Sequence, residues 1–215
     1  MTSPPAADFC YLGEEIRYRS WRISVTDARF AAPDGAEFHR DIVRHPGAVA
    51  VVALTDAGEV LLVRQYRGAV DRHLLEIPAG TRDVDGEPPA ETARRELLEE
   101  VGVDAGRMRP LGVMLNSPGF CDEETHLFLA TDLTPGVPSR HGVEEDHIEV
   151  LAVPLAEVDG LMASGELVDG QTLLGLFLAL RLLDADAPTD TAPTDTAPTD
   201  TAPTDSADAD RGGPT

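Results

Sequence analysis

Residues 80–103 read GTRDVDGEPPAETARRELLEEVGV, and the second half of this stretch predicts an amphipathic helix with an acidic face. The helix is expected over residues 88–101, with proline in its first turn. Glu96, Glu99 and Glu100 are spaced i, i+3 and i+4, so they share one face of this helix. Apolar residues occupy the adjoining face, which predicts that the helix buries one side and presents three carboxylates beside it.

Three carboxylates on one helix face repel one another unless a cation lies between them. Like charges at i,i+4 cost roughly 0.2–0.5 kcal/mol per pair in solvent, and more in a cleft. Hard cations such as Mg²⁺ prefer carboxylate oxygens, so the three glutamates are candidate metal ligands. Arg95 lies four residues before Glu99 and can orient that carboxylate. Taken alone, the same spacing is more typical of an ordinary solvated acidic face.

The context of the three glutamates resembles a known motif. The stretch is similar to the Nudix box, Gly-x5-Glu-x7-Arg-Glu-U-x-Glu-Glu-x-Gly-U, in which U is a bulky aliphatic residue. Every position from Glu87 onward matches. There is one departure, because six residues rather than five separate Gly80 from Glu87. The additional residue falls in the turn at residues 83–86, where a loop can absorb it.

The resemblance implies a Nudix fold, an α/β/α sandwich with a mixed sheet, and hydrolysis of a nucleoside diphosphate linked to another group. Carried over by position, Glu96 and Glu100 become catalytic metal ligands, and Glu99 becomes a further ligand or a support. The main-chain carbonyl of Ala79 becomes an additional ligand. The metal is Mg²⁺, with Mn²⁺ as the alternative. The resemblance gives structural roles to four residues: Arg95, Gly80, Glu87 and Gly102.

Segments on both sides of the box resemble the ADP-ribose pyrophosphatase subgroup. They are LVRQYR at residues 62–67, LEIPAG at 75–80, RDIVRHPGAVAVV from Arg40, and SPGFCDE at 117–123. Pro118 lies 15 residues beyond Val103, where this subgroup carries its marker proline. The resemblance implies hydrolysis of ADP-ribose to AMP and ribose 5-phosphate. The alternatives are another nucleotide sugar or a dinucleotide as substrate, or a non-catalytic domain that senses an ADP-ribose-like ligand.

Several residues outside the box are candidates for binding this small-molecule substrate. A diphosphate requires cationic donors, and the forked guanidinium groups of Arg40 and Arg67 suit it, although either could be an ordinary surface arginine. Glu76 could contact ribose hydroxyls or the metal site, or it could be a structural carboxylate. Phe38 or Trp21 could stack on adenine, although a buried aromatic is the more common role.

Hydrolysis also requires a base that takes a proton from the attacking water. In the subgroup, a glutamate on a loop well past the box serves as this base or as a further metal ligand. The corresponding segment is HGVEEDHIEV at residues 141–150. We select Glu145 for this role, with Glu144 as the alternative, because a carboxylate near a metal can accept the proton. A charged loop that faces solvent is the competing interpretation.

The remainder of the chain predicts strands around the box helix. Apolar or alternating runs lie at residues 20–30, 37–44, 48–54, 59–66, 74–77, 111–114, 126–130 and 148–153. The first two are expected to form antiparallel N-terminal strands over about residues 18–45. Two further helices are expected over residues 154–164 and 169–183, the second capped by Asp169. This order predicts a mixed sheet with helices packed on it.

Composition divides the chain into one folded domain over residues 1–183 and a tail over residues 184–215. The tail has no aromatic residue and no Val, Ile, Leu or Met, and it repeats TAPTD three times. Such a segment cannot offset the entropy of ordering, so we expect it to be disordered. The net charge of −22 argues against a nucleic-acid partner, which requires clustered basic residues.

The compartment and the oligomeric state follow from weaker signals. The sequence has no signal-peptide pattern and no apolar run long enough to span a bilayer, so we expect a cytoplasmic protein without a membrane partner. Its two cysteines, Cys10 and Cys121, exclude a disulfide framework within one chain. The resemblance implies a homodimer whose N-terminal strands are exchanged or packed against the partner.

Overall fold

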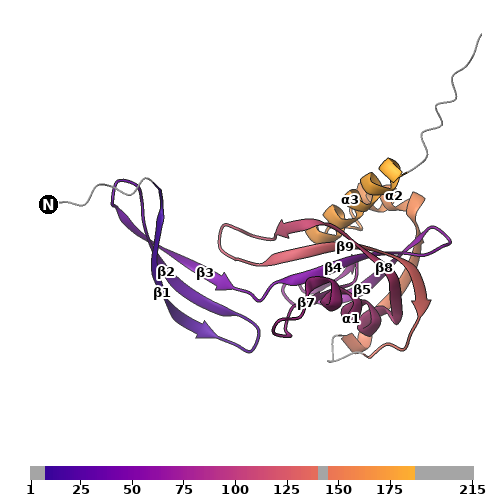
Figure 1. The fold of residues 1–215 in the computed structure, drawn as a ribbon, viewed down its shortest axis with the longest axis horizontal. Helices are drawn as coiled ribbons and strands as arrows, with labels where there is room; N and C mark the ends of the chain where they lie inside the picture. The colour runs from indigo at the N-terminus through magenta and orange to yellow at the C-terminus, as the bar shows by residue number, and fades with distance from the viewer. Residues whose placement is uncertain (1–7, 140–144, 187–215) are drawn as a thin grey trace, which may run out of the picture.

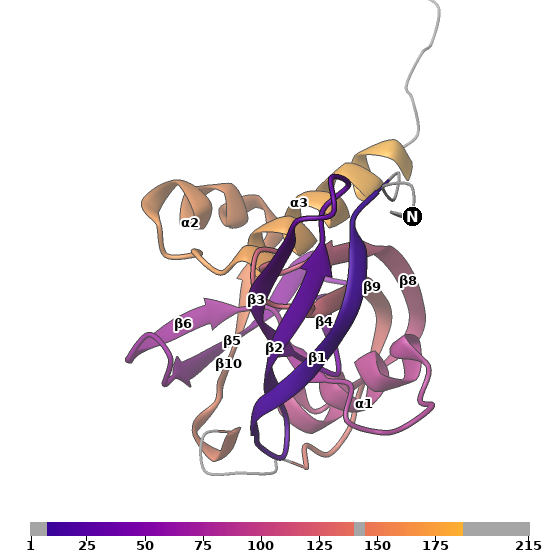
Figure 2. The ribbon, with the colours of Figure 1, turned by 90° about the vertical axis from the view of Figure 1, so that its left-hand side faces the viewer.

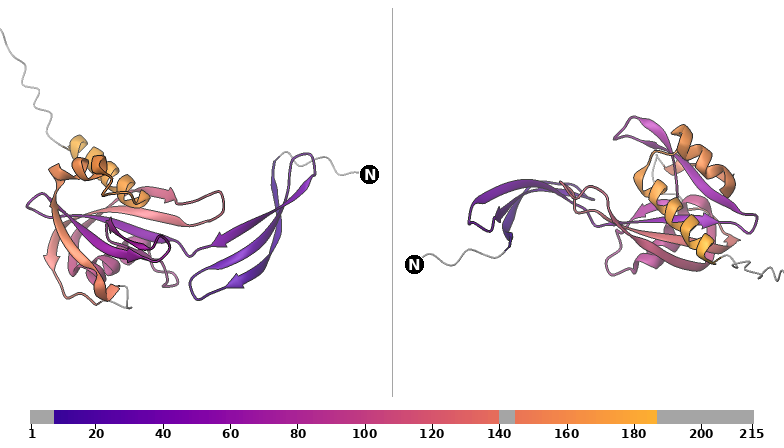
Figure 3. Two further views of the ribbon diagram at one scale, coloured as in Figure 1. Left: turned by 180° about the vertical axis from the view of Figure 1, so that it is seen from behind. Right: turned by 90° about the horizontal axis from the view of Figure 1, so that it is seen from above.

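The computed structural model describes residues 8–139 and 145–186, which form two separate sheets. The smaller sheet is antiparallel and has the order β1-β2-β3. Its strands are β1 (Cys10–Arg19), β2 (Ser24–Ala31) and β3 (Glu37–Arg44). This N-terminal sheet stands apart from the rest of the molecule, and β3 leads directly into the larger sheet (Figures 1 and 3).

The larger sheet is mixed and has seven strands in the order β10-β5-β4-β9-β8, with β6 paired to β5 and β7 paired to β4. The strands are β4 (Ala48–Leu54), β5 (Glu59–Arg67), β6 (Arg72–Glu76), β7 (Ala79–Thr81), β8 (Val103–Leu115), β9 (Glu124–Pro135) and β10 (Glu149–Pro154). Only the central pair β4–β9 is parallel within the part of the chain that the structure describes. The helices are α1 (Pro89–Val101), α2 (Val158–Ser164) and α3 (Gly170–Asp186), with short 3-10 turns η1 (Glu145–His147) and η2 (Leu155–Glu157).

The central strand β4 has both faces covered, and this makes the domain a three-layer sandwich. Alternate side chains of a strand point to opposite faces. Val49 and Val51 pack with Leu97 of α1 in one core cluster. Ala50 packs with Leu176 of α3 in the other cluster. The two helices lie on opposite sides of the sheet (Figure 2), so the predicted α/β/α sandwich with N-terminal antiparallel strands is confirmed.

The N-terminal sheet is longer than the sequence predicts, because β1 begins at Cys10 rather than near residue 18. The β1–β2 register shifts between Tyr11 and Gly13 and again between Ile16 and Tyr18. Each shift interrupts the alternation that identifies a strand in sequence. Gly13 also has φ +121°, a backbone conformation that other residues rarely adopt.

Strand β8 is also longer than its predicted core at residues 111–114. Its sequence includes Pro110, and a register shift occurs between Pro110 and Gly112. Proline lacks the N–H that a central strand needs, but β8 lies at an edge of the sheet, where proline is tolerated. These interruptions explain why only the end of the strand could be detected in the sequence.

The last helix, α3, begins where the sequence predicts and ends later. Asp169 accepts hydrogen bonds from the main-chain N and the Oγ1 of Thr172, at 2.9 and 2.7 Å, as an N-cap does. The helix continues to Asp186, past the expected domain end at residue 183, and Arg109 of β8 forms an ion pair with Asp186. The remainder of the predicted tail, residues 187–215, lies outside the described residues.

None of the helices in the described ranges is long and apolar enough to cross a membrane.

Candidate active site

The acidic helix α1 lies directly against the strand that precedes it in the box. A Cβ added to Gly80 would lie 2.0 Å from Cδ of Glu96, so only glycine allows this side chain to contact the backbone of β7. At the other end of α1, Gly102 adopts φ 75° and donates its N–H to the carbonyl of Leu98 at 3.0 Å. This left-handed residue ends the helix immediately after its last glutamates.

The additional residue in the loop before α1 is accommodated by a tight turn. Gly86 has φ +77°, and the N–H of Glu87 donates to the carbonyl of Val84 at 3.1 Å. After this turn, Glu87 still lies beside the acidic helix, because its carboxylate contacts the guanidinium of Arg95 at 3.2 Å. The departure from the motif is therefore confined to the loop.

Arg95 connects the loop to the acidic face of α1. Its guanidinium contacts four carboxylates: Asp83 at 3.3 Å, Glu87 at 3.2 Å, Glu96 at 2.8 Å and Glu99 at 3.2 Å. A planar guanidinium fixes the direction of each carboxylate that it binds. Arg95 thus orients the carboxylates of Glu96 and Glu99 through direct contacts with each of them.

Glu96 and Glu100 are buried acids. Burial raises the pKa of Glu96 to about 7, and the nearby charge of Glu99 contributes to the increase. Glu100 is only 5% exposed. Burial raises its pKa to about 8, against the effect of a hydrogen bond from the N–H of Ala79 at 3.1 Å. Ionising both groups together is unfavourable unless a cation accompanies them.

These side chains line a pocket of about 660 Å³ between the sheet and α1. Its lining residues are Trp21, Arg22, Gln65, Arg67, Ala79, Gly80, Thr81, Asp83, Arg95, Glu96, Glu99, Glu100 and Glu145. The structure therefore brings together the three box glutamates, Ala79, Arg67 and Glu145. The charge of Glu145 contributes to the raised pKa of Glu100, which indicates that the two carboxylates are near neighbours. The alternative base, Glu144, lies outside the described residues.

The donors in this pocket fit a hard divalent cation. They are carboxylate oxygens, which Mg²⁺ and Mn²⁺ prefer over the nitrogen and sulfur donors suited to softer metals. Within residues 8–139 and 145–186, no three acidic, His or Cys side chains converge on one point in their present rotamers. Glu96 turns toward Arg95 and Glu100 toward the N–H of Ala79. A cation would compete with these contacts and would offset the cost of two buried negative charges.

Arg67 faces the pocket and is held from behind by Glu76. Its Nε and Nη2 donate to Oε2 of Glu76 at 2.9 and 2.6 Å, and Glu76 is only 2% exposed. Burial alone would lower the pKa of Arg67, but the hydrogen bonds to Glu76 and the charges of Glu76, Glu100 and Asp169 hold it above its ordinary value. Arg67 is therefore a fixed cation, and Glu76 acts on the pocket through it.

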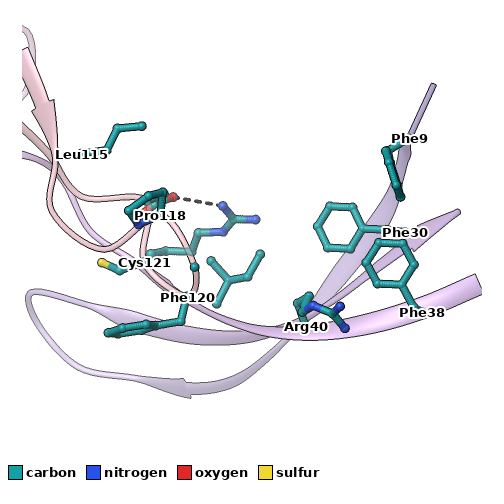
Figure 4. Close-up of a pocket in the computed structure, with 12 residues that line it drawn as sticks. Phe9, Phe30, Phe38, Arg40, Leu115, Pro118, Phe120 and Cys121 are labelled. Atoms are coloured by element: carbon teal, nitrogen blue, oxygen red, sulfur yellow. Dashed lines mark hydrogen bonds and ion pairs between the residues drawn. The ribbon is translucent and has the colours of Figure 1, made fainter. Parts of the chain in front are cut away.

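Phe38 and Arg40, two of the predicted substrate-binding residues, do not line the carboxylate pocket. They line a second pocket of about 480 Å³, whose other wall carries Pro118 and Phe120 (Figure 4). Phe38 stacks on Phe30 with ring centroids 5.4 Å apart, and Cζ of Arg40 lies 4.7 Å from the Phe38 ring. Within a single chain, these two candidate substrate residues therefore line a different pocket from the one that contains the carboxylates.

A family model for the NUDIX domain matches residues 44–173. This chain belongs to the Nudix family. It is 42% identical over 140 residues to the ADP-ribose pyrophosphatase of Bacillus subtilis, covering 65% of this chain and 75% of the relative. It is also 42% identical over 170 residues to the ADP-ribose pyrophosphatase of Mycobacterium tuberculosis, covering 79% and 82%.

The crystal structure of an ADP compounds hydrolase superposes with a TM-score of 0.73, covering 86% of this chain and 98% of that chain. At 24% sequence identity, that likeness establishes the fold. The sequence-based assignment to the Nudix family and to its pyrophosphohydrolases is confirmed.

The Nudix pocket includes Gln65, which the sequence did not single out, and Trp21, which it named as a candidate for stacking on adenine. Gln65 is only 6% exposed and lines the pocket from β5. It has the same parity in β5 as the buried Val63, so a polar residue at a core-facing position was the available signal. Trp21 is 81% exposed, which overturns the expectation of a buried aromatic, and Cζ of Arg22 lies 4.3 Å from its ring centroid.

Proposed function

We propose that this Nudix enzyme hydrolyses the diphosphate of ADP-ribose to AMP and ribose 5-phosphate, with Mg²⁺ as its metal. One observation carries the proposal. A single pocket combines buried carboxylates of α1 with an arginine from β5 and a glutamate from η1. A diphosphate needs both kinds of group, because its charge must be neutralised by cations while its phosphorus is attacked by an activated water. The names of the two relatives support ADP-ribose as the substrate.

Glu96 and Glu100 are the proposed metal ligands, with Glu99 and the carbonyl of Ala79 as additional ligands. Mg²⁺, or Mn²⁺ in its place, would supply positive charge to the diphosphate and lower the pKa of the attacking water. The contribution of this chain is to orient the donors. Arg95 binds Glu96 and Glu99 from the helix side, and the N–H of Ala79 binds Glu100.

Arg67 is the proposed phosphate-binding residue. Two of its three guanidinium nitrogens, Nε and Nη2, are bonded to Glu76. Its Nη1 has no hydrogen-bond partner among the described residues and can donate to a phosphate oxygen of the substrate. The rigid pair Arg67–Glu76 would therefore bind the diphosphate with little loss of side-chain entropy on binding.

Trp21 and Gln65 are proposed to contact the nucleoside portion of the substrate. An exposed indole at the rim of a polar pocket offers a flat surface on which adenine can stack. The buried amide of Gln65 offers a donor and an acceptor that a ribose hydroxyl could satisfy. Both residues line the same pocket as the carboxylates.

Glu145 is the proposed general base. It lines the pocket from η1, immediately after the segment at residues 140–144. Its charge contributes to the raised pKa of Glu100, which supports a position near the proposed metal ligands, where it would accept a proton from a metal-bound water.

A homodimer is proposed as the functional form. Phe38 and Arg40 do not line the carboxylate pocket of their own chain, so a substrate-binding role for them requires the pocket of a second copy. The exposed aromatic side chains of the N-terminal sheet support such an interface, because large apolar patches on a protein surface mark association sites. The two free thiols, Cys10 and Cys121, suit the reducing cytoplasm as the proposed compartment.

The function is tested by a substrate panel with Mg²⁺, with Mn²⁺ and with a chelator. ADP-ribose, nucleotide sugars and dinucleotides are each incubated with the purified chain, and the products are separated by anion-exchange chromatography. We expect the highest kcat/KM for ADP-ribose, with AMP and ribose 5-phosphate in equal amounts and no turnover in chelator. A preference for another substrate would overturn the choice of ADP-ribose. Tight binding of ADP-ribose without turnover would instead indicate a sensor.

A further inference from the structure

A hydrogen-bonded chain connects the start of α3 to the segment between β6 and β7. Thr172 is fully buried, and its Oγ1 donates to Oδ2 of Asp169 at 2.7 Å. The same oxygen accepts the N–H of Ile77 at 3.1 Å, across 95 residues of sequence. A hydroxyl has one proton, so the bond to Asp169 turns an oxygen lone pair toward Ile77.

Ile77 lies in a break between two strands, where the hydroxyl of Thr172 accepts its main-chain N–H. Strand β6 ends at Glu76 and β7 begins at Ala79, so residues 77 and 78 belong to neither strand. Pro78 has no N–H, which leaves Ile77 as the main-chain donor of the break. Ile77 is 1% exposed, and a buried N–H without an acceptor is strongly unfavourable. Thr172 supplies that acceptor.

Close packing of α3 keeps the two segments together. A Cβ added to Gly175 would lie 2.8 Å from Cδ1 of Ile77, so the absence of a side chain lets the helix approach this residue. On the opposite side, the carbonyl of Pro78 accepts the N–H of Val51 at 2.9 Å. The break is therefore held between α3 and the central strand β4.

Residues adjoining the break orient the pocket. Glu76 precedes it and binds Arg67, and Ala79 follows it and donates its N–H to Glu100. Displacement of the break would move the anchor of the phosphate-binding arginine and the donor of a metal ligand together. The charge of Asp169 also acts on Arg67, which places the start of α3 within electrostatic range of the pocket.

We propose that Thr172, oriented by Asp169, is a positioning residue for the active site, because it holds the segment that aligns Arg67 and Glu100. This proposal rests on the proposed function for its substrate, since Arg67 is taken to bind the diphosphate. Thr172 is not among the residues that line the pocket, so its proposed influence passes through the main chain at Ile77.

The test is Thr172→Val, which keeps the shape of the side chain and removes the hydroxyl. We expect the KM for ADP-ribose and the Mg²⁺ concentration for half-activation each to increase about 10-fold, as the loss of one buried acceptor implies. The kcat at saturation should fall by less than about threefold. Thr172→Ser retains the hydroxyl and should restore both constants to within about twofold of the parent.

A matched control separates positioning from stability. Thr125 is also fully buried, and its hydroxyl bonds Asn116 away from the pocket. Thr125→Val should lower Tm while KM and the Mg²⁺ constant stay unchanged. The proposal is overturned if Thr172→Val behaves in the same way, with a lower Tm and parental constants. If Thr172→Val does not fold, Asp169→Ala is measured instead, because it frees the hydroxyl to rotate, and an unchanged KM would again overturn the proposal.

Binding of Mn²⁺, followed by electron paramagnetic resonance, provides a readout that does not depend on the substrate. Thr172→Val should bind Mn²⁺ several-fold more weakly than the parent and Thr172→Ser, because the Ala79 donor to Glu100 is displaced. If the parent does not hydrolyse ADP-ribose, the proposed function fails while this comparison still decides the role of Thr172. Equal Mn²⁺ affinities in all three proteins would refute the positioning role.

Discussion

The carboxylate pocket and the N-terminal sheet both differ from the usual distribution of side chains. The pocket buries charged groups, whereas the N-terminal sheet exposes apolar ones. Charged groups are ordinarily exposed, yet Glu100 is only 5% exposed in the pocket. Large apolar groups are ordinarily covered, yet Tyr18 near the end of β1 is 59% exposed and Phe9, just before the start of β1, is 63% exposed. Each departure supports what we propose for its region: a buried negative charge favours a cation, and an exposed apolar face favours another protein surface.

The difference also concerns how each region holds its side chains. In the pocket, Arg95 and the N–H of Ala79 fix the carboxylates through polar contacts within the chain. On the N-terminal sheet, the rings of Phe30 and Phe38 stack on one another and also contact the rings of Tyr11 and Phe9. Both regions therefore hold their side chains by contacts within the chain, which are polar in the pocket and aromatic on the N-terminal sheet.

The largest expected effect concerns the base in the pocket. General-base catalysis is worth about 10²–10⁴-fold, so Glu145→Gln should lower kcat by about that factor with little change in KM. Steady-state kinetics with ADP-ribose at saturating Mg²⁺ provide the measurement. Glu144→Gln is the matched neighbour and should have a far smaller effect. Equal effects of the two substitutions, or a larger effect at Glu144, would show that Glu145 was the wrong choice.

The next effect concerns the buried carboxylates that we propose as metal ligands. Glu100→Gln preserves the shape of the side chain and removes the charge, so activity should fall about 100-fold or more while the fold is retained. Glu91→Gln changes an exposed glutamate at the other end of the same helix and should leave activity at the parental level. Turnover by Glu100→Gln within threefold of the parent would contradict the assignment.

Because the pKa of Glu100 is raised, Glu100→Gln should also change how the stability of the protein depends on pH. A carboxyl whose pKa rises from 4.5 to about 8 on folding destabilises the protein as pH rises between these values, because the unfolded chain ionises more readily. In chelator, the Tm of the parent should therefore fall from pH 5.5 to pH 8 by more than the Tm of Glu100→Gln. Circular dichroism melts at both pH values measure this, and parallel curves would show that Glu100 ionises freely.

The pocket was more predictable from sequence than the sheet, and the reason is geometric. Glu96, Glu99 and Glu100 are spaced to share one turn of a helix, so local structure alone brings them together. Glu145 could be located only through the resemblance, since a loop glutamate carries no periodic signal. Arg67 could be identified, but its pairing with Glu76 could not, because the β5–β6 register places Glu76 opposite Val63 and the two side chains meet by reaching along the hairpin.

Other residues could not be placed because their environment is decided by tertiary structure. Phe38 has the residue type of a base-stacking group, but β3 presents it to a different pocket. Gln65 lies between the exposed residues Arg64 and Tyr66 of β5, and the sequence does not show that this core-facing position opens into the cleft. Strand β1 was missed because two register shifts disrupt its alternation.

A smaller effect is expected on the N-terminal sheet. Ile16 is 46% exposed on β1, and Ile16→Glu would place a charge on the face proposed to meet a second copy. We expect the protein to shift toward the monomer in analytical ultracentrifugation. We also expect kcat/KM to fall about 10-fold, because Phe38 and Arg40 would lose access to the carboxylate pocket of the second copy. The comparison variant is Phe177→Ser, which alters an exposed aromatic of α3 and should change neither quantity. A parent that is already monomeric at full activity would refute the interface.

The smallest effect is expected from removing residues 187–215, which carry six Asp and one Arg and therefore a net charge of −5 out of −22. If acidity as such attracted the cation, this deletion would raise the Mg²⁺ concentration for half-activation. We expect that constant to stay within about twofold and Tm within about 1 °C, because solvated charges are screened beyond about 8 Å at physiological ionic strength. Glu96 and Glu100 are buried and are screened far less. A clear rise in the Mg²⁺ constant at unchanged Tm would assign part of the cation attraction to the tail. A drop in Tm of several degrees would show instead that the tail packs on the domain.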